Sequence, residues 1–167
     1  MKKIVLFILF ATSLINAQHK SKIVTDERSG KPMLVGICDR TSLQDSNFAW
    51  WYEPEYNNYE FSTSTIDSIK NKLDDISILI VLGSWCSDSR REVPRFLRIL
   101  DELKFSFEKV TLNFVDRKKE SPEGNLSDLE IKFVPTFIFY KNGNEIGRII
   151  ETPTTSLETD FKNILYK

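Results

Sequence analysis

The feature that most constrains the fold of this chain is an apolar run from Ile76 to Leu82. The run is too short for a typical helix and rich in β-branched residues, so we predict a central strand that is buried on both faces. Gly83 closes it, and after the turn at residues 84–86 apolar positions recur at three- and four-residue intervals. The sequence therefore predicts a buried strand, a tight turn and an amphipathic helix, with Cys86 at the helix N-terminus.

Periodicity also predicts the elements around this unit. We expect strands at residues 33–37, 110–115, 136–140 and 145–150. We expect helices at residues 64–73 and 155–165. The pair Asn142-Gly143 is typical of a hairpin turn, and Pro94 predicts a kink in the long helix. This order predicts an α/β fold, a mixed central sheet flanked by helices on both faces.

The N-terminus has the pattern of an export signal. Lys2 and Lys3 precede an apolar run over residues 4–15, and Ala17 supplies a small residue before a cleavage site. The run is shorter than the ~18 to 20 residues that span a bilayer, so a retained anchor is the weaker alternative. We predict a signal peptide at residues 1–17, a periplasmic or secreted protein, and no membrane association after cleavage.

The remaining length of this 167-residue chain suits one domain with an N-terminal extension. We place the extension at residues 18–63 and the α/β domain at residues 64–167. Residues 18–31 are polar and lack periodicity, which predicts a flexible lead-in. Residues 48–61 are rich in aromatic side chains, and we expect these to pack as additional core, with a peptide-binding face as the alternative.

The charge balance argues against a nucleic-acid-binding protein. The chain has 23 basic and 24 acidic residues, for a net charge of −1, and it contains no basic stripe. His19 is the one histidine, and it lies in the polar lead-in without the neighbours that a metal site or a catalytic base needs. We expect no metal, no cofactor, no nucleic-acid partner, and a monomer.

Cys86 is the candidate nucleophile. The N-terminus of a helix presents unpaired amide donors and a partial positive charge, which favour a thiolate over a thiol. Arg90 and Arg91 add positive charge about one turn away, which favours the thiolate, whereas the negative charge of Asp88 disfavours it. The sequence does not decide which effect is larger. Ser89 shares a helix face with Cys86 and could donate a hydrogen bond to the thiolate. An inert core cysteine is the alternative.

Three motifs together resemble the thioredoxin superfamily: the segment 81–89 with its Trp-Cys turn, Pro94, and the segment 134–137. The resemblance covers residues 64–167 and implies a thioredoxin-like fold with a cis peptide bond at Val134-Pro135 close to Cys86. It also implies that the backbone before Pro135 pairs with a substrate chain, beside Trp85. More narrowly, the Cys-x-Asp-Ser turn followed by residues 91–96 is similar to exported monothiol thioredoxin-family proteins of Bacteroidetes-type bacteria.

Two departures from ordinary thioredoxins limit the chemistry that the resemblance implies. Ser89 replaces the second cysteine, and Ile80 stands where thioredoxins often bury a carboxylate. The domain therefore cannot cycle as an independent dithiol. Cys86 can still attack a substrate disulfide to give a mixed disulfide, which an outside thiol must resolve. The expected partners are exported proteins or a low-molecular-weight thiol.

Several alternatives stay open at this level. Cys38 could resolve the mixed disulfide, bridge to Cys86, or be a merely buried residue, and a bridge requires α-carbons within ~7 Å. The whole domain could be a monothiol exchange enzyme or isomerase, or a non-catalytic thioredoxin scaffold that binds thiol-bearing or unfolded clients. Peroxide reduction is a weaker third class, because Gly83 stands three residues before Cys86, where a threonine would be expected.

Overall fold

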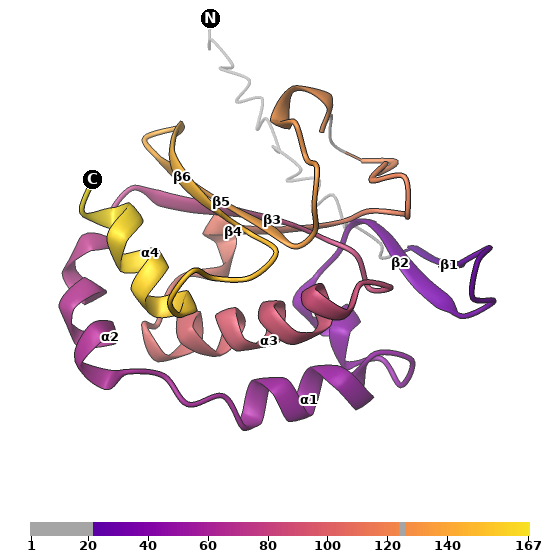
Figure 1. Cartoon of the computed structure of the whole chain (residues 1–167), viewed down its shortest axis with the longest axis horizontal. Helices are drawn as coiled ribbons and strands as arrows, with labels where there is room; N and C mark the ends of the chain where they lie inside the picture. Colours follow the sequence, from indigo (N-terminus) through magenta and orange to yellow (C-terminus); the bar gives the residue numbers. More distant parts are fainter. Residues whose placement is uncertain (1–21, 124–125) are drawn as a thin grey trace, which may run out of the picture.

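A six-stranded mixed sheet organises the part of the chain that this computed structural model describes, residues 22–123 and 126–167 (Figure 1). The predicted signal peptide at residues 1–17 and His19 lie outside the described residues. The strand order is β1-β2-β4-β3-β5-β6, and β3 and β4 pair in parallel. The strands are β1 (Lys22–Thr25), β2 (Pro32–Ile37), β3 (Ile76–Leu82), β4 (Val110–Phe114), β5 (Thr136–Lys141) and β6 (Asn144–Ile150).

Four α-helices are found in the described residues, and short 3-10 turns join some of the elements. The helices are α1 (Ala49–Asn57), α2 (Thr63–Ile69), α3 (Ser87–Glu102) and α4 (Leu157–Leu165). The mixed sheet flanked by helices that the sequence predicts is thus confirmed. Within residues 22–123 and 126–167, no helix combines the length and apolarity that crossing a bilayer requires.

The central strand β3 is confirmed with the predicted bounds. It lies between β4 and β5, and its even-numbered residues Ile78 and Ile80 point into the main core. On the other face, Val81 is fully buried and Leu79 partly buried, in a smaller cluster. Burial on both faces explains why this strand has an almost continuous apolar sequence.

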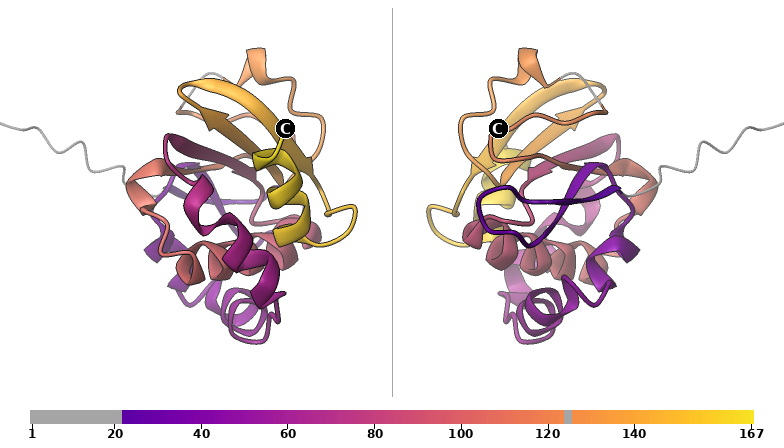
Figure 2. Two further views of the ribbon diagram at one scale, coloured as in Figure 1. Left: turned by 90° about the vertical axis from the view of Figure 1, so that its left-hand side faces the viewer. Right: turned by 90° about the vertical axis from the view of Figure 1, so that its right-hand side faces the viewer.

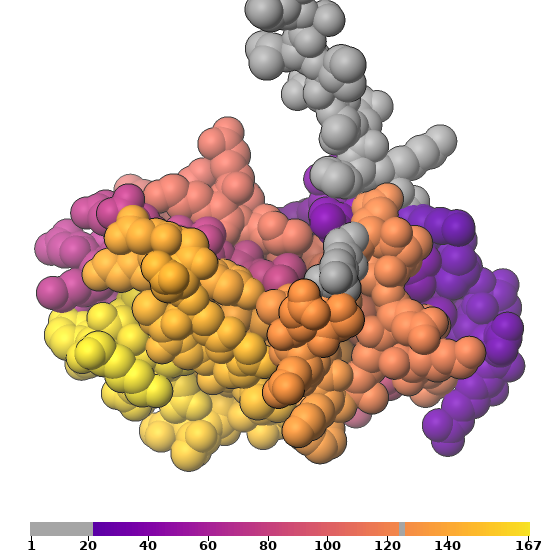
Figure 3. Space-filling model, turned by 90° about the horizontal axis from the view of Figure 1, so that it is seen from above, coloured from indigo at the N-terminus to yellow at the C-terminus, as the bar shows by residue number. Residues whose placement is uncertain are grey.

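All four α-helices lie on the same face of the sheet (Figures 1 and 2). The expectation of helices on both faces is therefore wrong. The opposite face is covered by residues 116–123 and 126–133, which hold one 3-10 turn at Ser127–Leu129, and Leu126 and Ile131 pack against the smaller cluster that contains Val81. In Figure 3 the described part of this segment, in orange, crosses that face. The segment lacks the apolar spacing that would make it a helix.

The N-terminal extension contributes to the sheet. β1 and β2 form an antiparallel hairpin, and β2 continues into the sheet by pairing with β4, with Gly36 opposite Phe114. The expectation of a flexible lead-in over residues 18–31 is thus wrong for β1. The sequence of β1 is short and has little strand pattern of its own, so β1 forms because it pairs with β2.

The aromatic stretch packs mainly as additional core, as expected. Helix α1 lies along α3, and Phe48, Trp51 and Tyr52 are buried in the main cluster (Figure 1). Arg40 fastens this region to α3 through hydrogen bonds of 2.8 and 2.6 Å to Asp101. Trp50 is the exception, because 62% of its surface is exposed.

Candidate functional site

Cys86 lies at the N-cap of α3, directly after the turn that ends β3. Its backbone N–H donates to the Gly83 carbonyl at 2.9 Å, and its own carbonyl accepts from the Arg90 N–H at 3.1 Å. The side chain is partly exposed, and its thiol donates to the Val134 carbonyl at 3.1 Å. The Val134-Pro135 peptide bond is cis. The structure thus brings together Cys86, Val134 and Pro135 from distant parts of the chain.

The ring of Trp85 is held against the base of this turn. Its Nε1 donates to the Val115 carbonyl at 2.9 Å, and the Arg117 Cζ lies 4.9 Å from the centroid of the ring. A Cβ atom at position 83 would lie 2.7 Å from the indole. Because side-chain atoms do not approach so closely, Gly83 is required for this placement of Trp85.

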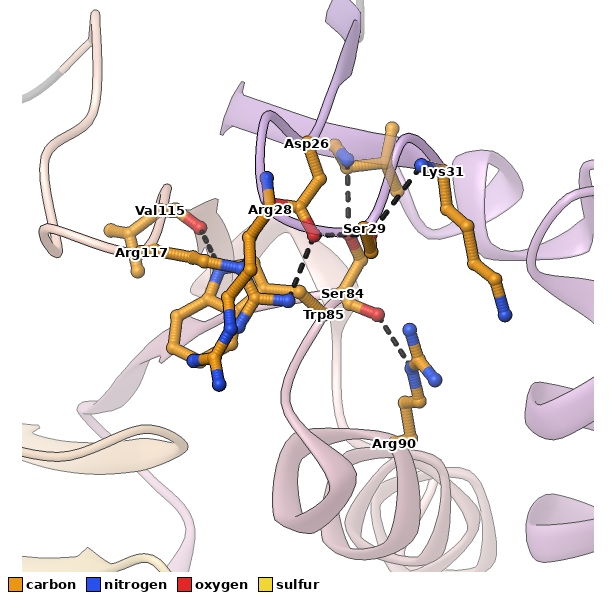
Figure 4. Close-up of polar contacts among 10 residues, drawn as sticks. Asp26, Arg28, Ser29, Lys31, Ser84, Trp85, Arg90, Val115 and Arg117 are labelled. Atoms are coloured by element: carbon orange, nitrogen blue, oxygen red, sulfur yellow. Dashed lines mark hydrogen bonds and ion pairs between the residues drawn. The ribbon is translucent and has the colours of Figure 1, made fainter.

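Arg117 is fixed by a carboxylate from the N-terminal hairpin (Figure 4). Its Nε and Nη2 each donate to Asp26 at 2.8 Å, and the hydroxyl of Ser29 donates to the same carboxylate. Asp26 is 2% exposed, and the hydrogen bonds from Arg117 hold the pKa of its carboxyl well below the usual range. The pairing of Asp26 with Arg117 is not predicted from the sequence, since an aspartate in a polar segment carries no signal of a distant partner.

Of the predicted charge modulators, Arg90 is the one whose charge acts on Cys86. Its Nε donates to the Ser84 carbonyl at 2.6 Å, and its Cζ lies 5.5 Å from the centroid of the Trp50 ring. Burial lowers the pKa of Arg90, and the negative charge of the Cys86 thiolate opposes this shift. By contrast, Arg91 pairs with Asp88 at 2.8 Å, so these two charges compensate each other.

Ser89 is fully buried, and its side chain forms a hydrogen bond with the backbone. Its Oγ accepts a hydrogen bond of 3.2 Å from the Gly83 N–H, across the strand-to-helix turn. In the described chain the expected hydrogen bond between Ser89 and the Cys86 thiol is not formed, because the thiol is directed to Val134. Ile80 is also fully buried, opposite Leu112 and Phe137 on the neighbouring strands. Neither residue can move a proton to or from a sulfur atom here.

Cys38 lies apart from this site. It is 4% exposed in the main core, whereas Cys86 packs against the smaller cluster on the other face of the sheet. Its thiol points to the carbonyls of Gly36 and Val35, at 3.5 and 3.7 Å. Burial raises the pKa of the Cys38 thiol to about 11. Both cysteines are free thiols, so the structure contains no bridge between them.

The site holds no set of metal ligands. Among residues 22–123 and 126–167, no group of three or more His, Cys, Asp or Glu side chains is arranged to hold a metal ion. What the arrangement offers is a partly exposed thiol, the amide donors at the start of α3, the guanidinium of Arg90, and the backbone of residue 134. These groups suit nucleophilic chemistry at sulfur.

Comparison with known proteins gives one family match and several relatives. The family model described as thioredoxin matches residues 50–161. Thioredoxin O, mitochondrial, of Oryza sativa subsp. japonica is 27% identical over 106 residues, which are 62% of this chain and 59% of that protein. A thioredoxin-like protein of Acanthamoeba polyphaga mimivirus is 26% identical over 99 residues, 59% of this chain and 66% of that protein. The chain thus spans less than two thirds of either relative.

The solved structures similar to this chain share little sequence with it. Mitochondrial thioredoxin 3 from Saccharomyces cerevisiae, in its oxidised form, has a TM-score of 0.39 and 25% identity, covering 59% of this chain and 89% of that one. A protein of unknown function from Pseudomonas aeruginosa has a TM-score of 0.49 and 13% identity, covering 71% of this chain and 79% of that one.

Proposed function

The chain belongs to the thioredoxin family, and from that premise we propose that it performs thiol–disulfide exchange or isomerisation on exported proteins through the single nucleophilic thiol of Cys86. The observation that carries the proposal is the position of this thiol. It is partly exposed at the N-terminus of α3 and lies 3.1 Å from the Val134 carbonyl, on the segment that the resemblance assigns to substrate binding.

The proposed reaction begins with the Cys86 thiolate. The thiolate attacks one sulfur of a substrate disulfide, a new disulfide bond forms to Cys86, and the old bond breaks. The other substrate sulfur leaves with the bonding electron pair and takes a proton from solvent. The amide donors at the start of α3 and the charge of Arg90 both stabilise the attacking thiolate.

The second half of the reaction needs a thiol from outside the domain. Ser89 has no sulfur, and Cys38 is buried in a different cluster. A thiol of the substrate itself would complete an isomerisation, and a separate thiol would complete a net reduction. The exported setting is part of the proposal and is supported by the signal pattern at residues 1–17.

The proposal is tested by measuring the alkylation rate of Cys86 with iodoacetamide between pH 5 and pH 10. We expect Cys86 to react faster at neutral pH than the cysteine of an unfolded peptide, with no modification at this position in Cys86→Ser. A rate at neutral pH no higher than that of the peptide would show that the thiol is not activated. Trapping in the periplasm, followed by identification of proteins disulfide-linked to Cys86, would then define the clients.

A non-catalytic binding module is the second candidate function. The buried Ser89 and the apolar Ile80 favour it, because both remove parts that a reductase uses. A Cys86→Ser variant separates the two functions. Client binding that persists in this variant, without any covalent adduct in the native protein, supports the binding module, whereas loss of capture supports exchange at Cys86.

A further inference from the structure

Arg90 differs from most of the other arginines in the described residues because it lacks a carboxylate partner. Five arginines each lie within 4 Å of at least one carboxylate: Arg40, Arg91, Arg95, Arg117 and Arg148. Arg90 uses its Nε to bind the Ser84 carbonyl, and its Nη1 and Nη2 bind no group in residues 22–123 or 126–167. Neither Nη atom is buried, so both reach solvent.

The guanidinium of Arg90 is nevertheless held in one place. The hydrogen bond of 2.6 Å to Ser84 fixes one edge, and the Trp50 ring lies 5.5 Å from its Cζ. Arg90 begins the second turn of α3 and donates its backbone N–H to the carbonyl of Cys86. A fixed cation beside a reactive thiol, with two free donor nitrogens, is suited to bind an anion that arrives with the substrate.

Two pairs of opposite charges lie close to the thiol's turn and helix. Arg117 is neutralised by Asp26, and Asp88 is neutralised by Arg91. Arg90 has no carboxylate within ion-pair distance, and its charge acts on Cys86. A carboxylate is the common anion that the fork of a guanidinium binds with two parallel hydrogen bonds, and both free Nη atoms are available for it.

We propose that Arg90 is a specificity-determining residue, which selects disulfides that carry a carboxylate close to the sulfur that Cys86 attacks. This inference rests on the proposed exchange at Cys86. The carboxylate would belong to an acidic residue beside a protein cysteine, or to a low-molecular-weight disulfide, and the chemistry at Arg90 is the same for both. The exchange step is unchanged: Arg90 orients and attracts the substrate and takes no part in bond breaking.

Two alkylating agents test the inference at Cys86. Iodoacetate and iodoacetamide react with a thiolate by the same displacement of iodide, but only iodoacetate carries a carboxylate. We take the ratio of the rate constant with iodoacetate to that with iodoacetamide. The thiolate fraction and the intrinsic reactivity of Cys86 cancel in this ratio. Relative to a cysteine peptide, we expect this ratio to be about threefold to tenfold higher in the native protein at low ionic strength, and to fall as salt is added.

Arg90→Gln, Arg90→Lys and Arg98→Gln provide the matched variants. Arg98 lies on the same helix about 12 Å further along, contacts the rings of Tyr56 and Phe61, and also lacks a carboxylate within 4 Å. We expect Arg90→Gln to reduce the ratio to that of the peptide, Arg90→Lys to retain only the part that charge alone supplies, and Arg98→Gln to preserve it. An unchanged ratio in Arg90→Gln, with native circular dichroism, overturns the inference.

Disulfide probes then identify the source of the carboxylate. Oxidised thioglycolate is compared with oxidised 2-mercaptoethanol, and a peptide disulfide flanked by glutamates with its glutamine counterpart. Faster mixed-disulfide formation with oxidised thioglycolate alone indicates a small substrate, whereas a preference for the glutamate peptide indicates a protein segment. No preference in either pair overturns the inference. Failure of Cys86 to react with iodoacetamide or any disulfide would instead overturn the proposed function.

Discussion

The carboxylate of Asp26 binds the guanidinium of Arg117 through two hydrogen bonds of 2.8 Å, and Arg117 in turn covers the ring of Trp85, next to Cys86. This relationship connects the β1–β2 hairpin to the strand-to-helix turn. The family match begins at residue 50, so the hairpin is a part of this chain outside the matched domain that supports the site.

We predict that Asp26→Asn lowers the free energy of unfolding at pH 7 by about 2 kcal/mol, between the values for exposed and for buried ion pairs. Urea denaturation measures the change. Asp67→Asn is the control, because Asp67 pairs with Lys70 at an exposed position, and its substitution should cost much less. Equal effects of the two substitutions would contradict this account of Asp26.

The contribution of Asp26 should also depend on pH. Its pKa is lowered in the folded state, chiefly by the hydrogen bonds from Arg117, so the folded state favours the ionised form. The resulting stability is fully present above the unfolded pKa of ~3.9 and is lost as the pH falls further. The difference in unfolding free energy between the native protein and Asp26→Asn should therefore be constant from pH 7 to about pH 5 and narrow below pH 4.

Gly83→Ala should displace the ring of Trp85, since the added Cβ would lie 2.7 Å from the indole. We expect a loss of about 1 to 3 kcal/mol in unfolding free energy, together with a change in the near-ultraviolet circular dichroism. Gly143→Ala is the comparison, because its Cβ meets no atom within 4 Å but its φ of +80° strains the backbone. It should lower stability without altering the tryptophan signal. A native spectrum for Gly83→Ala would argue against the contact.

Ser89→Cys should restore a dithiol on the first turn of α3. Positions three apart share a helix face, so the new thiol can reach Cys86. On mild oxidation we expect both thiols to be lost without dimer formation, and the reduction of insulin by dithiothreitol to become faster. Ser89→Ala, which retains one thiol at this site, should show neither change. A Ser89→Cys protein that forms only intermolecular disulfides would contradict the prediction.

Cys38 should be inert in the native protein. Its pKa is raised to about 11 by burial, so at pH 8 the thiol is almost wholly protonated as well as shielded from solvent. Alkylation at pH 8, followed by mass spectrometry of the two cysteine peptides, should show modification at Cys86 alone. Both peptides should be modified in urea, which controls for detection. Comparable native rates at the two cysteines would show that Cys38 is accessible.

The sequence predicts best the elements whose pattern is local. The strand Ile76–Leu82 is marked by its apolar run and the long helix after Cys86 by its periodicity, and both are found where expected. The hairpin strand β1 and the pair of Asp26 with Arg117 depend on groups far away in the chain, the latter 91 residues apart, so no local pattern marks them. Trp50 and Trp51 are adjacent, yet one is exposed and the other buried, which only the placement of α1 decides.

The unequal covering of the two sheet faces has a consequence for access to the thiol. The helices anchor the large core on one face, whereas Val134 packs in the small cluster under the segment 116–133. In residues 126–133 only Leu126 and Ile131 pack against this cluster, so we expect local opening there to need less free energy than global unfolding. Amide hydrogens at residues 126–134 should accordingly exchange with deuterium much sooner than those of α3. A polypeptide that approaches Cys86 from the side of Val134 therefore meets the more weakly anchored face of the domain.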